Sequence, residues 1–150
     1  MAKFKFRLAT FLRLREATRD ERRAELAEAY RVDDLLRQRQ DTVGRELGWL
    51  KSQCRRAAGP GAVNIDQLVE GQRYELALKA QQSQLARQRE AVAAEIQRRQ
   101  QALVEANREV RVLEKLRERQ ALHHQQEENR QEIKQLDETA GRRAAQEAVL

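Results

Sequence analysis

Apolar side chains recur at spacings of three and four residues along two long stretches of this chain. That spacing places residues on one face of an α-helix that packs against another helix. The first stretch predicts a helix over about residues 4–56, with polar residues at several of its seam positions. Its predicted seam consists of Phe4, Leu8, Phe11, Ala29, Val32, Leu36, Val43 and Leu50.

The two stretches are separated by Gly59-Pro60-Gly61, which contains the only proline of the 150 residues. Proline cannot continue a helix beyond its first turn, and the neighbouring glycines allow the backbone to reverse at little cost. The sequence therefore predicts one turn over about residues 57–64.

The second stretch predicts a helix over about residues 65–140, followed by a frayed tail to residue 150. Asn64 can cap its start, and Asp66 lies near the positive end of the helix dipole. Beyond Leu113 the apolar positions change phase, which predicts a change of supercoil or of partner. The seam comprises Leu68, Leu78, Leu85, Val92, Ile96, Leu103, Ala106, Val110 and Leu113, and the shifted positions are Leu116, Leu122, Ile133 and Leu136.

These elements predict an all-α fold, a single antiparallel coiled-coil hairpin spanning residues 1–150. If the chain reverses near residue 61, residues that face each other have numbers adding to about 122. The first helix then ends opposite about residue 118, so the second helix overhangs from Arg119 onward. Twenty further helical residues extend about 30 Å.

The composition predicts a thin core and no enclosed site. Charged residues make up 36% of the chain and aromatic residues 4%. The chain has no phosphate-binding or dinucleotide-binding glycine pattern and no nucleophile beside a base. His123 and His124 are adjacent and point in different directions on a helix, and Cys54 is the only cysteine. We therefore expect no enzyme activity, cofactor, metal or intramolecular disulfide.

The net charge of +6 is concentrated at the start of the chain, where the first 23 residues carry eight basic and three acidic side chains. A basic end favours an acidic partner, so one alternative function is the binding of nucleic acid or an anionic membrane surface. A dimer with exchanged helices is a second alternative. The first apolar run, residues 8–12, is too short for a signal peptide, and a cytoplasmic location is expected.

Three segments resemble the flagellar FliJ family, small coiled-coil proteins of the flagellar type III export apparatus. The opening segment, residues 4–16, resembles the start of its members. Residues 113–119 resemble a segment of their second helix. The third set consists of Glu128, Arg130, Glu132, Lys134, Leu136, Asp137, Glu138 and Ala140.

The resemblance implies a non-enzymatic stalk, similar in shape to the central stalk of rotary ATPases. Its implied partners are the hexameric flagellar export ATPase, the cytoplasmic domain of the export-gate membrane protein and export chaperones, with no nucleic acid. Its implied roles are to promote ATPase assembly and activity and to recycle chaperones. Its implied location is the cytoplasm, at the inner face of the cell membrane at the flagellar base.

If the resemblance holds, the basic, partly unpaired helical end is the candidate contact for the ATPase ring. Large side chains near the turn are the candidate contact for the export gate or a chaperone. The ring candidates are Arg7, Arg13, Arg15, Arg117, Arg119, Leu122, Arg130, Ile133 and Leu136. The gate or chaperone candidates are Trp49, Tyr74 and Leu78.

Overall fold

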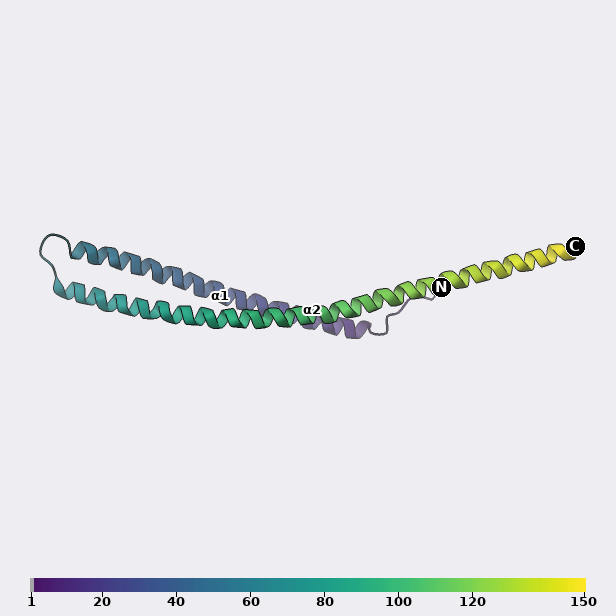
Figure 1. Cartoon of the computed structure of the whole chain (residues 1–150), viewed down its shortest axis with the longest axis horizontal. Coiled ribbons are helices and arrows are strands. Elements are labelled where there is room, and N and C mark those ends of the chain that lie inside the picture. The colour runs from purple at the N-terminus through teal and green to yellow at the C-terminus, as the bar shows by residue number, and fades with distance from the viewer. Residues whose placement is uncertain (1) are drawn as a thin grey trace. The chain divides into compact units, whose positions relative to one another are not determined.

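A computed structural model describes residues 2–150, which contain two α-helices and no strand. Helix α1 spans Ala9–Ala57 and helix α2 spans Ile65–Val149 (Figure 1). The chain divides into two units. Unit 1 comprises Met1–Asp20 with Glu105–Leu150, and unit 2 comprises Glu21–Val104. In each unit a part of α1 packs antiparallel on a part of α2, so the predicted all-α hairpin is confirmed.

The core of unit 2 is a single apolar cluster near the turn. Leu78 and Leu85 of α2 are 3% and 4% exposed, as their predicted seam positions require. On α1, Leu47 also enters the core, whereas Val32 stays 41% exposed and was wrongly placed in the seam. The buried members are Val43, Leu47, Leu50, Leu78 and Leu85, with Leu36 and Cys54 packed against them.

A polar layer in unit 2 fixes how the two helices align. Arg89 donates from Nε to Asp33 Oδ1 (3.1 Å) and from Nη1 to Gln40 Oε1 (3.0 Å). The hydrogen bond to Asp33 raises the pKa of Arg89 above its usual value. Residues 33 and 89 add to 122, so the predicted alignment is confirmed at this pair. A directional bond of this kind opposes sliding of one helix along the other.

The turn between α1 and α2 contains a glycine with positive φ and an asparagine cap, as the sequence predicts. Gly61 has a φ of +138°, a conformation that side chains with a Cβ rarely adopt. At the start of α2, the backbone N–H of Gln67 donates to Asn64 Oδ1 (3.4 Å), so the predicted cap is confirmed. Arg55 and Arg56 lie in the last turn of α1, where positive charge is favourable.

Close packing beside the turn gives a stability prediction at Gly71. A Cβ at this position would lie 2.9 Å from Cys54 Sγ. Gly71→Ala is therefore expected to lower the free energy of unfolding by about 1 kcal/mol, despite the better helix propensity of alanine. In a Cys54→Ala background the clash is absent, and the same change should stabilise by up to about 1 kcal/mol. Urea denaturation followed by circular dichroism tests this, and an effect of the same sign in both backgrounds would contradict it.

In unit 1 the start of the chain is not helical. Helix α1 begins at Ala9 rather than near Phe4, and the Ala9 N–H donates to Phe6 O (3.2 Å). Phe6 packs against a buried cluster of Leu12, Val110 and Leu113. Leu8 and Phe11 are predicted seam residues, but they are 40% and 41% exposed. The face of α1 that packs on α2 carries Leu12 instead, and Phe6 of the non-helical start packs beside it.

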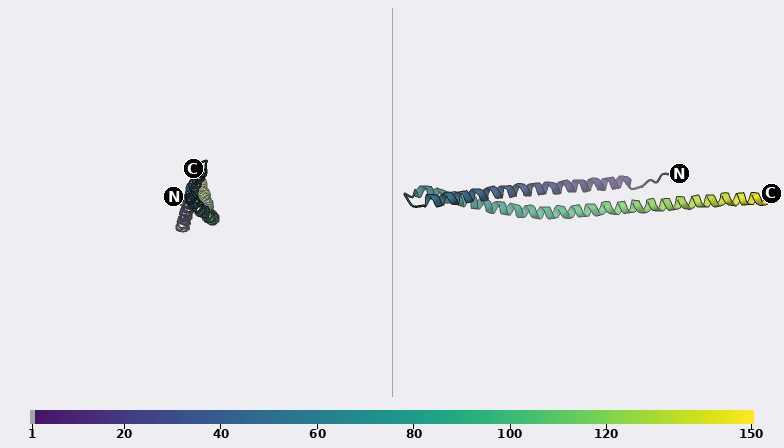
Figure 2. Two further views of the ribbon diagram at one scale, coloured as in Figure 1. Left: turned by 90° about the vertical axis from the view of Figure 1, so that its left-hand side faces the viewer. Right: turned by 90° about the horizontal axis from the view of Figure 1, so that it is seen from above.

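The non-helical start also moves the beginning of the overhang. An extended chain advances about 3.3 Å per residue and a helix about 1.5 Å, so residues 2–8 reach further along α2 than a helix would. His124 Nε2 lies 3.1 Å from Ala2 O, and the ring of Phe4 lies 5.7 Å from that of His124. The overhang therefore does not begin at Arg119. The last part of α2 extends beyond the start of the chain (Figure 2). Residues 129–150 are all exposed.

Helix α2 continues to Val149, beyond the predicted end near residue 140. Its last part is rich in Ala, Glu, Gln and Arg, which are strong helix formers. Their propensity carries the helix through the stretch expected to fray.

Candidate protein-interaction surfaces

The C-terminal part of α2 in unit 1 carries an exposed apolar stripe made of Leu122, beside the segment that Ala2 and Phe4 contact, and of Ile133 and Leu136 on the overhang. These side chains are 58%, 59% and 69% exposed. Separations of 11 and 14 residues are about three and four helical turns, so the three side chains share one face. We call this face the C-terminal stripe.

The C-terminal stripe points away from the packed face of α2. Leu122 follows the buried Leu113 by nine residues, about two and a half turns, which places the two on opposite sides of the helix. His124, on the packed side, contacts Ala2 and Phe4. Of the predicted positions after the change of phase, Leu122, Ile133 and Leu136 therefore lie on the outer face, whereas Leu116 stays half-buried.

The arginines predicted to contact the ATPase ring also lie in unit 1. They differ in whether they form ion pairs within the protein. Arg7, Arg13, Arg117 and Arg119 are exposed. Arg130 pairs with Glu127 through Nη1 and Oε1 (3.0 Å) on its own helix. Arg15 pairs with Glu109 across the helices (2.9 Å), and its guanidinium lies 4.9 Å from the centre of the Phe11 ring. Arg15 thus supports the packing of unit 1 as well as adding charge to its surface.

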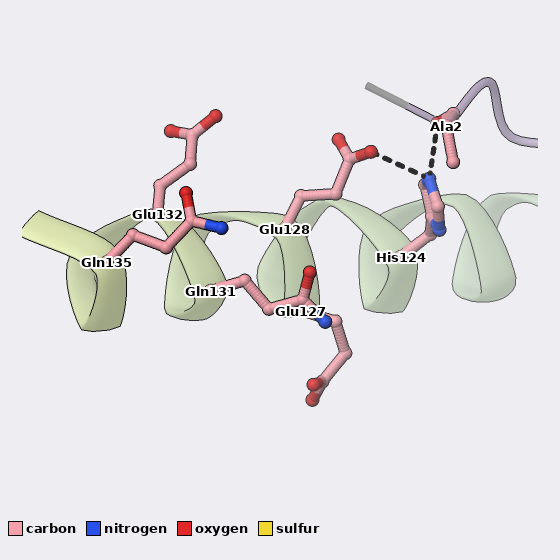
Figure 3. A pocket seen from close by; sticks show the side chains of 7 residues that line it. All are labelled: Ala2, His124, Glu127, Glu128, Gln131, Glu132 and Gln135. Atoms are coloured by element: carbon pink, nitrogen blue, oxygen red, sulfur yellow. Dashed lines mark hydrogen bonds and ion pairs between the residues drawn. The ribbon is translucent and has the colours of Figure 1, made fainter.

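A polar hollow of about 530 Å³ lies beside the contact between Ala2 and His124 (Figure 3). His124 Nε2 also lies 3.2 Å from Glu128 Oε1. Sequence reasoning missed this contact, although the alternating Phe-Lys-Phe-Arg run is typical of an extended segment. Among residues 2–150, no group of three or more His, Cys, Asp or Glu is placed to hold a metal.

Unit 2 presents the large side chains predicted near the turn, with one correction. Trp49 is 63% exposed and borders a hollow of about 180 Å³ beside Cys54. Tyr74 is 47% exposed, and its hydroxyl donates to Glu46 Oε2 (3.4 Å). Leu78 is 3% exposed in the core, so it cannot contact a partner while unit 2 is folded. Leu78 is also a predicted seam residue, and its side chain points inward as a seam position requires.

Unit 2 also has an exposed apolar stripe that sequence reasoning missed. Ile65, Val69 and Leu76 are 71%, 42% and 68% exposed. Their separations of four and seven residues place them on one face of α2. The signal was present in the sequence, but the inner seam through Leu68 and Leu78 was followed instead.

Two packed helices with exposed apolar and basic residues on their outer faces define a coiled-coil protein. Among the described residues, no helix is both long and apolar enough to cross a membrane. A sequence model of the family described as "Flagellar FliJ protein" matches residues 4–148, so the chain belongs to the FliJ family. No curated protein and no solved structure matches the chain.

Membership of this family makes the protein a component of the flagellar export apparatus. The family is a non-enzymatic part of that apparatus, and it implies a cytoplasmic location near the flagellar base.

Proposed function

We propose that this protein is a stalk that binds the hexameric flagellar export ATPase and promotes its assembly and activity. The C-terminal stripe carries the proposal, because its three large apolar side chains are more than half exposed and two of them, Ile133 and Leu136, lie on the overhang of unit 1. A helix of about 20 residues without tertiary contacts is marginal in water. A partner that covers the C-terminal stripe would stabilise the overhang.

The C-terminal stripe also offers enough apolar surface to support binding. Complete burial of one leucine or isoleucine side chain contributes about 1.5–3 kcal/mol. The exposed arginines Arg117 and Arg119 lie on the same helix before Leu122, where they add attraction for acidic residues of a partner. Arg7 and Arg13 supply further exposed positive charge in unit 1. Apolar anchors with basic neighbours suit a groove lined by acidic and polar side chains.

The binding step is tested by gel filtration of the full chain mixed with the export ATPase, with ADP and a non-hydrolysable ATP analogue in parallel. The proposal predicts that the two proteins elute together. It also predicts that the complex weakens when Arg117 and Arg119 are both replaced by glutamine. Separate elution under every nucleotide condition would contradict the proposal.

A second contact is proposed for the export gate or an export chaperone, at Trp49 and Tyr74 of unit 2. Aromatic side chains are frequent anchors of protein interfaces, and both are about half exposed or more. The hollow beside Trp49 allows a partner side chain to insert next to the indole. Through this contact the protein would receive or return chaperones at the gate.

Trp49→Ala tests the second contact. Because the indole is 63% exposed, the change should alter the free energy of unfolding by less than about 1 kcal/mol. It should weaken binding to the gate domain or chaperone by tenfold or more, on the order of one interface anchor. Calorimetric titration of the gate's cytoplasmic domain and of each chaperone measures this. Leu35→Ala, at a side chain 55% exposed elsewhere in unit 2, is the control. Equal affinities for both variants would remove Trp49 from the interface.

A further inference from the structure

The first residues of unit 1 form an extended strap with two different sides. Phe4 and Phe6 are half-buried, whereas Lys3, Lys5 and Arg7, which alternate with them, are exposed. Alternation with a period of two is the geometry of an extended backbone. Phe6 is held by the cluster around Leu12, and Phe4 lies against His124. The two phenylalanines therefore hold the strap on α2 and turn its three cations toward solvent.

These cations have no acidic neighbours in sequence. Residues 2–15 contain five basic side chains and no aspartate or glutamate. Arg15 pairs with Glu109. Across residues 2–150, the structure gives no ion pair to Lys3, Lys5, Arg7 or Arg13. Elsewhere in unit 1 basic and acidic residues alternate, so this segment is its most uniformly positive surface.

Apolar side chains are exposed immediately after the strap. Leu8, Phe11 and Leu14 are 40%, 41% and 61% exposed and follow one another at intervals of three residues. Leu12, on the inner side, takes the place in the core. Cations and exposed apolar side chains thus occur together within a segment of about 12 residues.

We propose that this N-terminal segment, residues 3–14, binds the surface of an anionic lipid membrane. The cations would attract acidic headgroups, and Leu8, Phe11 and Leu14 would enter the boundary between headgroups and acyl chains. Peripheral attachment of this kind needs two weak signals together, and the segment supplies both. The proposal concerns a partner other than the ATPase and does not depend on it.

The exposed apolar residues favour a membrane over nucleic acid. Nucleic acids bind cations through phosphates and stack their bases on aromatic rings. Two of the three exposed apolar side chains, Leu8 and Leu14, are aliphatic, and phosphates surrounded by water offer them no burial. A lipid interface accepts cations and aliphatic side chains alike.

The test is flotation of the full chain with vesicles, without any ATPase, because Arg7 and Arg13 are also proposed ring contacts. Vesicles of phosphatidylglycerol mixed with phosphatidylcholine should bind the protein, and vesicles of phosphatidylcholine alone should bind it far more weakly. Each basic residue near an anionic surface strengthens binding about fivefold. The combined variant Lys3→Gln, Lys5→Gln, Arg7→Gln should therefore bind about a hundredfold more weakly.

A matched control removes the same charge from the other end of unit 1. Lys134, Arg142 and Arg143 are exposed, and their replacement by glutamine should leave vesicle binding within about threefold of the starting value. Equal losses in the two combined variants would show a response to net charge alone and would overturn the proposal.

The apolar contribution is tested by Leu14→Gln, at the most exposed of the three apolar side chains. This variant should bind phosphatidylglycerol vesicles roughly tenfold more weakly, since burial of the leucine is lost. Its helix content should not change. Failure of the unchanged protein to float with anionic vesicles would overturn the proposal. So would equally tight binding of duplex DNA at the same salt concentration with no effect of Leu14→Gln, because that result describes a general polyanion surface.

Discussion

Leu85→Ala is expected to lower the free energy of unfolding by about 3 kcal/mol, the middle of the range for a leucine truncated in a packed core. Leu85 is 4% exposed and belongs to the main apolar cluster of unit 2. A two-helix core has few other layers to compensate for a cavity. Urea denaturation followed by circular dichroism measures the change.

Leu35→Ala is the matched control for Leu85→Ala. It makes the same chemical change at a position of α1 that is 55% exposed. Exposed substitutions usually change stability by no more than about 0.5 kcal/mol. If both variants lost the same stability, the cluster around Leu85 would not be the core that holds unit 2 together.

Replacing Leu122, Ile133 and Leu136 together with serine is expected to leave the folded protein almost as stable as before, because these side chains are 58–69% exposed. The same variant should lose binding to the export ATPase. If each residue is half-buried at the interface, the loss is on the order of a hundredfold in affinity. Stimulation of ATPase turnover at fixed protein concentration should fall accordingly.

The control for the C-terminal stripe is the exposed stripe of unit 2. Replacing Ile65, Val69 and Leu76 with serine removes a similar apolar face from the same helix. That variant should retain ATPase stimulation. A sharp drop in melting temperature for the C-terminal variant, with stimulation preserved, would show that Leu122, Ile133 and Leu136 pack inside the protein.

Features set by local chemistry could be predicted from the sequence. The turn follows from Gly59-Pro60-Gly61, and the start of α2 follows from the side chain of Asn64. The alignment at Asp33 and Arg89 follows from where the chain reverses. The second seam was predicted well from Leu78 to Leu113 because large apolar residues recur there with few interruptions.

The start of α1 could not be predicted from helical spacing alone. Phe4, Leu8 and Phe11 fit a helical seam, whereas Phe4 and Phe6 fit an extended strand, and the sequence satisfies both patterns. Packing decided between them, because Phe6 completes the cluster around Leu12 and Val110. The same limit applies to Leu78, since a spacing of four from Tyr74 does not say which side of the helix faces the core.

The candidate surfaces were only partly predictable for a related reason. The members of the C-terminal stripe could be predicted from their helical spacing. The side of α2 on which they lie could not, because it depends on Leu113, nine residues before Leu122, packing inward. Arg15 is a predicted ring contact, but the sequence does not reveal that Glu109 lies across from it and pairs with it. Which residues can contact a partner is known only once the inner face of each helix is known.

The most direct test of the stalk proposal is the turnover of the flagellar export ATPase, titrated with this protein. The account predicts stimulation that saturates at one copy of the chain per six ATPase subunits, because one stalk serves one ring. Absence of stimulation across the titration, or saturation at one copy per ATPase subunit, would contradict it.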